Sequence, residues 1–290
     1  MLQFKSESKA CCCPRCICKT ASTAGLGFVS DIIQHPAFNC AKLAAVELRQ
    51  KKIIETVPRF GVIIQARMGS NRLPGKIAKI AGNKEYLLHL LERVLIKVPT
   101  HQAVVATTKN SEDDFTCELS SRCGVKFFRG DSQDVLKRYI DCAEENQFLD
   151  VVRLTGDNPL IDPYVIDEMI SVYFESEEKS KYLSNTLIPT FPIGFNVEIT
   201  SLENLKKSWN LCRCEYNCEH VTPFIKFGGV SGCSRINCSF EKNFSHLRFS
   251  LDTVDDHAQL SKIVGTINKF DMMSVIDFSV KTKLVRQNLN

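Results

Sequence analysis

The sequence has no apolar run long enough to cross a membrane, and it does not begin like a secreted protein. A membrane-spanning helix needs about 18 or more apolar residues in succession, which no part of these 290 residues provides. The start MLQFKSESK is polar and lacks the apolar segment of a signal peptide. The sequence therefore predicts a soluble, cytoplasmic protein with no membrane partner.

Net charge is almost absent from residues 60–290. Nine of the 37 Lys and Arg residues and four of the 33 Asp and Glu residues precede residue 60, which leaves 28 basic against 29 acidic residues. A domain that binds nucleic acid is usually basic, with Lys and Arg clustered on one face. The balanced charge predicts that nucleic acid is not a partner.

Two common catalytic motifs are also missing. No GxSxG nucleophile elbow occurs in the sequence. The segment after Gly69 is not a Walker A loop, because five residues rather than four separate Gly69 from Gly75. Ile77 also stands where that motif needs a Ser or Thr. Any phosphate site in this chain must be of another kind.

Cysteine is abundant, but it does not form a recognisable disulfide framework. The 14 cysteines are scattered through predicted helices and strands, which indicates reduced thiols. Five of them lie in CCCPRCIC at 11–18, where Cys13 and Cys16 form a CxxC pair. A metal site and a disordered extension are both compatible with this segment.

A second group of candidate zinc ligands lies near the carboxyl-terminal third of the chain: Cys212, Cys214, Cys218 and His220. In a helix the second and third of these cysteines are one turn apart, whereas the first lies off their face, so a tetrahedral site is awkward. Alternatively, His220 contacts the substrate together with Glu219. A single histidine more often has a purely structural role.

Residues 1–59 differ in composition from the rest of the chain, and we predict that they form an extension of unknown role before a single domain at 60–290. Within the extension, residues 31–56 have the apolar spacing of one or two short helices. The domain starts with Val62, Ile63 and Ile64, an unbroken apolar run typical of a strand covered on both faces of a parallel sheet.

Predicted strands and helices then alternate along the chain. Strands are expected at 103–108, 125–129 and 150–154, and helices at 85–98, 112–122, 132–146 and 163–175, with Asp131 or Ser132 capping the third helix. After residue 181, strands are expected in KYLSNT, GFNVEITS and RINCSF, helices at 201–210 and 216–227, then SHLRFSLDT and two final helices. This order predicts an α/β fold with a mostly parallel central sheet flanked by helices, plus a small antiparallel extension.

The first candidate site is the loop after the first apolar strand. It presents Arg67, Arg72 and Lys76 within ten positions, with Gly69 and Gly75 where the backbone needs a positive φ or a close approach to a ligand. Three cations at the carboxyl end of a strand suit a polyphosphate. A basic surface turn is the alternative.

Two carboxylates supply the other half of the predicted site. Asp157 lies in TGDNP at the end of one predicted strand, and Asp252 lies in LDTVDD after another. Both could converge on one Mg²⁺, which prefers one or two carboxylates together with substrate phosphates. Asp157 is alternatively a capping residue, and we expect at least one of Asp255 and Asp256 to belong to the first turn of a helix.

Seven segments, in this order, resemble the cytidylyltransferase family of spore coat polysaccharide biosynthesis: IIQARMGSNRLPGK, VVATT, FRGDSQDVLKRY, RLTGDNPLIDP, YLSNT, EHVTPFI and HLRFSLDTVDD. That family is related to CMP-N-acetylneuraminate synthetases and 3-deoxy-manno-octulosonate cytidylyltransferases. The resemblance covers residues 60 to 270. It implies a Rossmann-like nucleotidyltransferase, usually a homodimer, that uses Mg²⁺ to transfer CMP from CTP to an acidic or modified sugar with release of pyrophosphate.

The resemblance also implies roles for individual residues. Catalytic roles fall to Arg67, Lys76, Asp157 and Asp252, with the two carboxylates binding the metal; nucleotide contacts fall to Ala66, Gly69, Ser70, Arg72 and Thr107; sugar contacts fall to Asn196, Glu198 and His220. The chain departs from the family pattern at Asn196, where relatives usually carry an acidic residue. This change bears on the identity of the sugar, because Asn cannot supply negative charge.

Two other functions fit parts of the pattern. A glycosyltransferase also binds a nucleotide sugar through Mg²⁺ and carboxylates, but its usual DxD pair is reduced here to the single carboxylate of Asp157. A non-catalytic nucleotide-binding protein is the second alternative, suggested by Asn196 and the unusual extension. The retained cations and carboxylates favour the enzyme.

Overall fold

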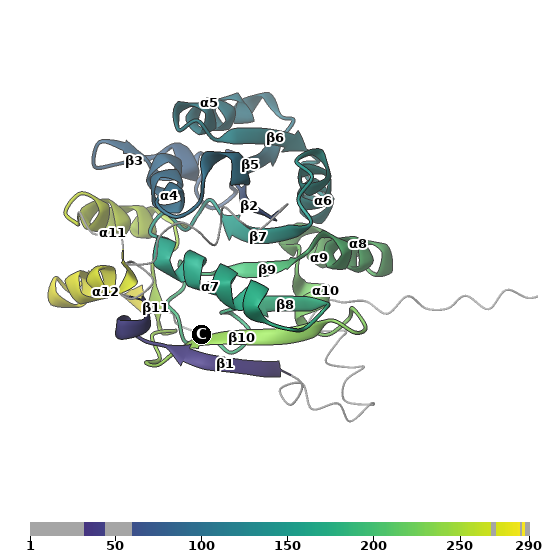
Figure 1. Cartoon of the computed structure of the whole chain (residues 1–290). Coiled ribbons are helices and arrows are strands. Elements are labelled where there is room, and N and C mark those ends of the chain that lie inside the picture. The colour runs from purple at the N-terminus through teal and green to yellow at the C-terminus, as the bar shows by residue number, and fades with distance from the viewer. Residues whose placement is uncertain (1–31, 44–59, 268–270, 285, 288–290) are drawn as a thin grey trace, which may run out of the picture.

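The computed structural model describes residues 32–43, 60–267, 271–284 and 286–287. Eight strands form one sheet in the order β1-β10-β8-β9-β7-β2-β5-β6 (Figure 1). Every neighbouring pair is parallel except the two pairs that involve β9, which runs against β7 and β8. The predicted α/β class and the mostly parallel sheet are confirmed.

The strands of the large sheet are β1 (Ile32–Phe38), β2 (Phe60–Gln65), β5 (Ala103–Thr108), β6 (Lys126–Gly130), β7 (Asp150–Thr155), β8 (Lys181–Ser184), β9 (Glu198–Ser201) and β10 (Ser234–Phe240). Two antiparallel pairs stand apart from it, β3 (Ile80–Ala81) with β4 (Lys84–Glu85) and β11 (Leu247–Arg248) with β12 (Arg286–Gln287). They confirm a small antiparallel extension.

The longer helices are α4 (Tyr86–Leu95), α5 (Asp114–Arg122), α6 (Val135–Glu145), α7 (Pro163–Glu175), α8 (Leu202–Leu211), α11 (Val254–Val264) and α12 (Met272–Lys281). Two short helices, α9 (Glu215–His220) and α10 (Pro223–Lys226), lie between α8 and β10. Within the described residues, no helix combines the length and the apolar character that a bilayer span requires.

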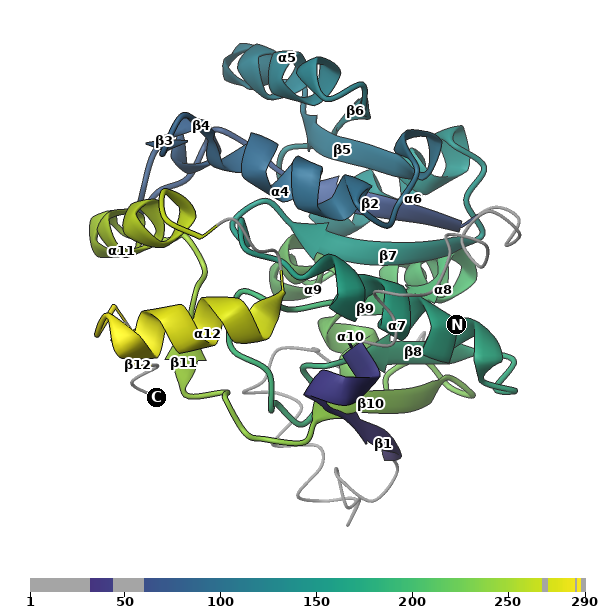
Figure 2. The same ribbon diagram turned by 60° about the vertical axis from the view of Figure 1, so that its left-hand side comes forward.

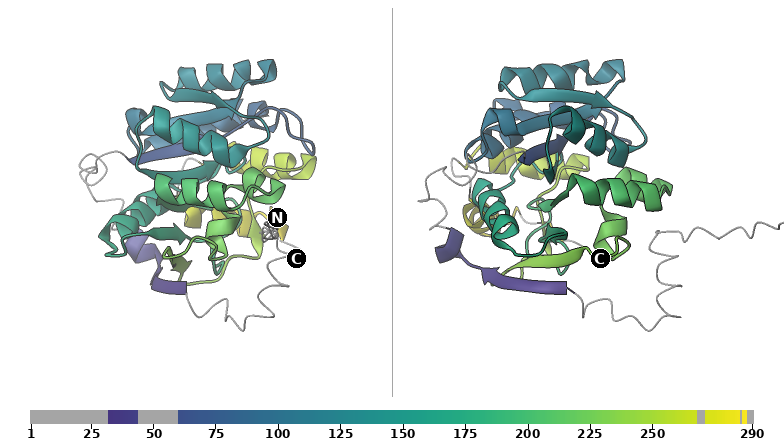
Figure 3. Two further views of the ribbon diagram at one scale, coloured as in Figure 1. Left: turned by 90° about the vertical axis from the view of Figure 1, so that its right-hand side faces the viewer. Right: turned by 45° about the vertical axis from the view of Figure 1, so that its right-hand side comes forward.

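The central strand β2 shows why this sequence builds a two-sided sheet. Val62, Ile63 and Ile64 are fully buried. Val62 and Ile64 join the apolar core that includes α4 and α7, whereas Ile63 joins the core on the α6 side. Figure 2 shows α4 and α7 in front of the sheet, and Figure 3 shows helices on both of its sides. Alternate side chains therefore enter opposite cores, which is why the run contains no polar position.

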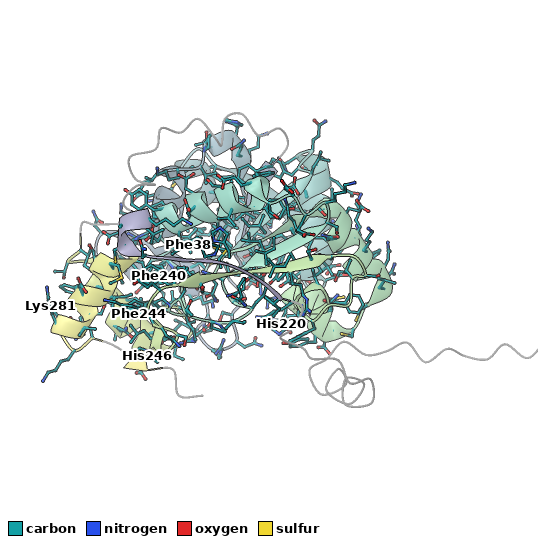
Figure 4. The ribbon with its side chains drawn as sticks, turned by 60° about the horizontal axis from the view of Figure 1, so that its bottom comes forward. Phe38, His220, Phe240, Phe244, His246 and Lys281 are labelled. Carbon is teal, nitrogen blue, oxygen red and sulfur yellow. The ribbon has the colours of Figure 1, made fainter. Side chains whose placement is uncertain are left out.

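The helical prediction for the segment before residue 60 is wrong at β1. Ile32–Phe38 forms an edge strand that pairs in parallel with β10. Its Pro36 is tolerated because an edge strand does not need every backbone N–H for pairing. Phe38 is fully buried, with its ring centroid 6.1 Å from that of Phe191, and Figure 4 shows it grouped with Phe240 and Phe244. The predicted cysteine site at 11–18 lies outside the described residues.

Two local predictions are also wrong. The cap of α6 is Asp134, which accepts a hydrogen bond from the backbone N–H of Lys137, and not Asp131 or Ser132. Asp131 instead accepts from the backbone N–H groups of Gln133 and Asp134, at 2.8 Å each, and so forms the turn before the helix. The single helix predicted at 216–227 is divided, since Pro223 has no N–H to continue a helix and starts α10.

Candidate functional site

The basic loop after β2 is held in place by its own backbone and by a buried carboxylate. Gly75 has a left-handed φ of 62°, and its N–H donates to the carbonyl of Met68 at 2.9 Å. A Cβ on Gly69 would lie 2.8 Å from a carboxylate oxygen of Glu112, but Glu112 is an exposed side chain that can move aside. The left-handed backbone therefore explains the glycine at position 75, whereas the structure gives no comparable requirement at Gly69.

Asp113 is the carboxylate that anchors this loop. It is fully buried and accepts the backbone N–H of Met68 at 2.7 Å. Its other contacts are the hydroxyls of Thr108 and Thr116 and the backbone N–H of Thr108. A buried carboxylate needs hydrogen-bond donors, and Asp113 receives them both from Met68 in the loop and from Thr108 at the end of β5. Asp113 therefore holds the loop against the end of β5. This residue was not among the predicted site residues.

Asp157 and Asp252 both contact the ammonium group of Lys76. The Lys76 Nζ atom lies 2.9 Å from Asp157 Oδ2 and 3.0 Å from Asp252 Oδ1. Asp157 follows β7 and Asp252 follows β11, so two distant segments bring their carboxylates to one point. The Thr155 hydroxyl also donates to Asp157 Oδ1 at 2.6 Å and fixes its orientation.

Asp252 is surrounded by positive charge. Arg72 donates to its Oδ1 at 3.0 Å, and Arg248 donates to its Oδ2. Burial raises the pKa of Asp252, but Lys76, Arg72 and Arg248 outweigh that effect and hold the pKa below its ordinary value. The carboxylate is therefore ionised at neutral pH.

Asp256 has a structural role instead. Its Oδ2 accepts the backbone N–H groups of Asp252 and Thr253, at 2.9 and 2.8 Å, and it completes a capping box with Thr253 at the start of α11. The prediction that one of Asp255 and Asp256 belongs to the first turn of a helix is confirmed. This cap also positions the backbone of Asp252.

These groups line a cleft of about 310 Å³ at the carboxyl edge of the sheet. Nine of the predicted site residues line it: Ala66, Arg67, Gly69, Ser70, Arg72, Lys76, Asp157, His220 and Asp252. Thr107, Asn196 and Glu198 are not part of its lining. Thr107 is fully buried, and its hydroxyl has no hydrogen-bond partner within the described part of the chain.

Glu198 acts on the cleft through Arg153. Its Oε2 accepts from Arg153 at 3.0 Å and from the Thr222 hydroxyl at 2.9 Å, and Arg153 lines the cleft. Asn196 is half-buried, and its neighbours Phe195 and Val197 are both hydrogen-bonded to the side chain of Asn185. The structure therefore places Glu198 next to the cleft and gives no cleft contact for Asn196.

A strained turn follows His220. Val221 has φ of 74° and ψ of −55°, and the N–H of Thr222 donates to the carbonyl of His220 at 2.9 Å. This is a γ-turn of the rare strained type, and it is unusual for a β-branched residue. The turn joins His220, which lines the cleft, to Thr222, which contacts Glu198. Strain of this kind is found where a surrounding structure fixes functional groups.

The zinc interpretation of Cys212, Cys214, Cys218 and His220 finds no support. The Sγ atoms of Cys212 and Cys214 lie 3.6 Å apart. Nowhere in the described residues do three or more His, Cys, Asp or Glu side chains form a group that could hold a metal ion. His220 instead contacts the ring of Tyr216, with 4.6 Å between centroids.

The two carboxylates that contact Lys76 nevertheless fit one hard divalent ion. One ammonium group contacts an oxygen of both carboxylates, so a single cation can reach both. Mg²⁺ is typically bound by only one or two carboxylates when the substrate supplies phosphate oxygens. Asp157 and Asp252 are the residues that would hold it.

Arg153 and Arg248 were not predicted as site residues, although a signal exists for both. Each is the single Lys, Arg, Asp or Glu residue of its segment, VVRLT and HLRFS. A charge at such a position needs a partner. Arg153 forms an ion pair with Glu198, and Arg248 forms one with Asp252. Sequence reasoning could have noted the charge but not the partner.

Residues 61–227 match the family model described as cytidylyltransferase. The chain is 31% identical over 232 residues to an uncharacterised protein of Methanocaldococcus jannaschii, covering 79% of this chain and 93% of that protein. It is 34% identical over 170 residues to the spore coat polysaccharide biosynthesis protein SpsF of Bacillus subtilis, covering 57% of this chain and 68% of that protein.

A solved structure agrees with these matches. A cytidylyltransferase from Leptospira borgpetersenii has a TM-score of 0.75 to this chain at 33% sequence identity, over 80% of this chain and 98% of that one. The family match begins after β1 and contains the basic loop and Asp157, whereas Asp252 lies beyond its end.

Proposed function

The chain belongs to the cytidylyltransferase family and is a nucleotidyltransferase, and from that premise we propose that it transfers CMP from CTP to a sugar, with release of pyrophosphate, for polysaccharide synthesis. The observation that carries the proposal is the meeting of Lys76, Asp157 and Asp252 at one point of the cleft. Cations beside paired carboxylates suit a substrate that brings both phosphate groups and a divalent ion.

Charge in the cleft favours a polyphosphate. Its lining carries four cations and three carboxylates: Arg67, Arg72, Lys76 and Arg153 against Asp157, Glu219 and Asp252. In this proposal Lys76 moves from the carboxylates to the triphosphate, and Arg67 and Arg72 bind beside it. The same cations stabilise the charge that develops on the departing pyrophosphate.

The chemical step needs position more than a strong base. A sugar hydroxyl oxygen forms a bond to the α-phosphorus while the bond from that phosphorus to the pyrophosphate oxygen breaks, and the hydroxyl proton is released. Holding the two reactants in line removes much of the entropic barrier. When bound at Asp157 and Asp252, Mg²⁺ supplies charge neutralisation of the phosphate oxygens.

We assign the sugar to the part of the cleft that contains Arg153, Glu219 and His220. The ion pair with Glu198 fixes the orientation of Arg153, and the γ-turn at Val221 fixes His220. An acidic or modified sugar would meet an arginine and a histidine here. Asn196 does not line the cleft, so we assign it no contact with the sugar.

The direct test is pyrophosphate release from CTP and Mg²⁺ with a panel of nine-carbon acidic, eight-carbon acidic and neutral sugars. We expect release with at least one sugar and a loss of about a hundredfold or more in Asp157→Asn, since one preorganised electrostatic contact is worth about that much. The matched control is Asp277→Asn, an exposed carboxylate on α12.

Release that does not exceed the Asp157→Asn background with any sugar would reject the proposal. Transfer of a labelled sugar from a nucleotide-sugar donor to an acceptor, without use of CTP, would identify a glycosyltransferase instead. The homodimer implied by the family resemblance stays a prediction, which light scattering in solution can test.

A further inference from the structure

A second cleft adjoins the first and differs from it in charge. It has a volume of about 710 Å³ and shares Arg67, Gly69, Asn71, Val135 and Glu219 with the first cleft. Its lining carries two cations against four carboxylates, namely Arg67 and Arg213 against Glu112, Asp134, Glu215 and Glu219. This excess of negative charge repels phosphate groups. A neutral part of the substrate, such as a nucleoside, suits it better.

Arg138 is a buried arginine next to this second cleft. It is fully buried, and its Nε, Nη1 and Nη2 atoms have no hydrogen-bond partner in the described part of the chain. Its stem lies against Gly130, where an added Cβ would come within 2.7 Å of the Arg138 Cγ atom. A guanidinium cannot lose its charge at ordinary pH, so a buried one without acceptors is costly. Such a group indicates that an acceptor is missing.

The helix directs Arg138 toward the wall of the second cleft. Arg138 lies one turn after Asp134 and Val135, which line that cleft. Side chains in a helix lean toward its amino end, so a long side chain at this position covers the turn before it. Burial is the main reason that the pKa of Arg138 lies below its ordinary value. The charge of Arg67 also lowers this pKa, whereas the charges of Asp113 and Asp131 raise it.

We propose that Arg138 distinguishes cytosine from uracil by donating two hydrogen bonds to the O2 and N3 atoms of the base. These two atoms are adjacent acceptors in cytosine, whereas N3 of uracil carries a hydrogen and is a donor. A guanidinium has only donors, so it pairs with the first base and opposes the second. The turn at 131–134, whose Asp131 and Gln133 are exposed, moves to let the base reach it.

A phosphate group is the less suitable acceptor. The first cleft already provides Arg67, Arg72 and Lys76 for phosphates, and the second cleft is negatively charged. The inference rests on the proposed use of CTP and adds the residue that selects the base.

The test is equilibrium binding of CTP and of UTP, measured by calorimetry with Mg²⁺ and without sugar, for the wild type, Arg138→Met and Arg138→Lys. We expect the wild type to bind CTP more tightly than UTP. In both variants the ratio of the two affinities should fall by about 5- to 150-fold, which is the range of one bidentate base contact. Lysine keeps the charge but lacks the two-pronged geometry. Arg122→Met, at an exposed arginine on α5, is the matched control and should keep the preference.

A structural role would give a different result. Removing an unpartnered buried charge should leave the thermal midpoint of the nucleotide-free Arg138→Met protein unchanged or raised, whereas a structural arginine would lower it. An unchanged ratio of CTP to UTP affinity in both variants overturns the inference and leaves the proposed function intact. If the wild type binds neither nucleotide, both proposals fail. If Arg138→Met does not fold, a structural role is indicated, and an unchanged ratio in Arg138→Lys then overturns the inference.

Discussion

Replacement of Lys76 by Met tests the centre of the proposed site. Lys76 Nζ contacts Asp157 and Asp252 at 2.9 and 3.0 Å, and the Lys76 side chain is only 14% exposed. Without it, Asp252 keeps Arg72 and Arg248, whereas Asp157 keeps the hydrogen bond from the Thr155 hydroxyl. Breaking a fully buried pair costs about 3–5 kcal/mol. Because these side chains are partly exposed, we expect the free energy of unfolding to fall by about 1–3 kcal/mol.

The catalytic effect should exceed the effect on stability. Lys76 binds the triphosphate in the proposed reaction, so kcat/KM for CTP is expected to fall about a hundredfold or more. Denaturant unfolding and pyrophosphate release are the two assays. The control is Lys281→Met, at an exposed lysine on α12 that Figure 4 labels.

The stability effect should also depend on pH. A lowered pKa in the folded state means that ionised Asp252 stabilises the fold above its unfolded pKa and loses this contribution as pH falls below about 4. The difference in stability between the wild type and Lys76→Met should therefore be largest at neutral pH and narrow in acid. Equal kcat/KM and equal stability for Lys76→Met and Lys281→Met at pH 7 would refute the reasoning.

Three further predictions concern the same contacts and the edge of the sheet. Without nucleotide, Lys76→Met should bind Mn²⁺, as a probe of the divalent site, more tightly than the wild type, because the ammonium no longer holds both carboxylates; equal affinity measured by paramagnetic resonance would contradict this. Asp113→Asn should weaken CTP binding measured by calorimetry and lower the thermal midpoint, because a group that accepts from Met68, Thr108 and Thr116 loses an acceptor oxygen; an unchanged Kd for CTP and an unchanged midpoint would argue against the anchor. Removal of residues 1–38 should lower the midpoint and increase aggregation relative to removal of residues 1–31, because only the longer deletion exposes the edge of β10; identical behaviour of the two would show that β1 is dispensable.

The placement of the candidate site was largely predictable, because its signals are local. The apolar run at Val62, Ile63 and Ile64 required a strand buried on both faces, and parallel strands bring their carboxyl ends to one edge of a sheet. The basic loop and Asp157 follow two such strands, β2 and β7, which are neighbours in the sheet. Their meeting in one cleft follows from the alternation of strands and helices.

Other features depended on pairs of residues that are distant in the sequence. The edge strand β1 was predicted as helix because its neighbour β10 lies about two hundred residues later, and only pairing with it makes the extended form favourable. Arg153 and Arg248 could be recognised as the single Lys, Arg, Asp or Glu residues of their segments, but not matched to Glu198 and Asp252.

The sequence by itself determined the α/β class, the basic loop and the two carboxylates, since apolar periodicity, glycine positions and charges are properties of short segments. Only the tertiary structure decided that one ammonium, that of Lys76, joins Asp157 to Asp252, and that the buried Arg138 guanidinium has no partner among the described residues. Both are decided by distances between side chains on separate elements. A linear pattern does not specify such distances, because packing of the whole chain sets them.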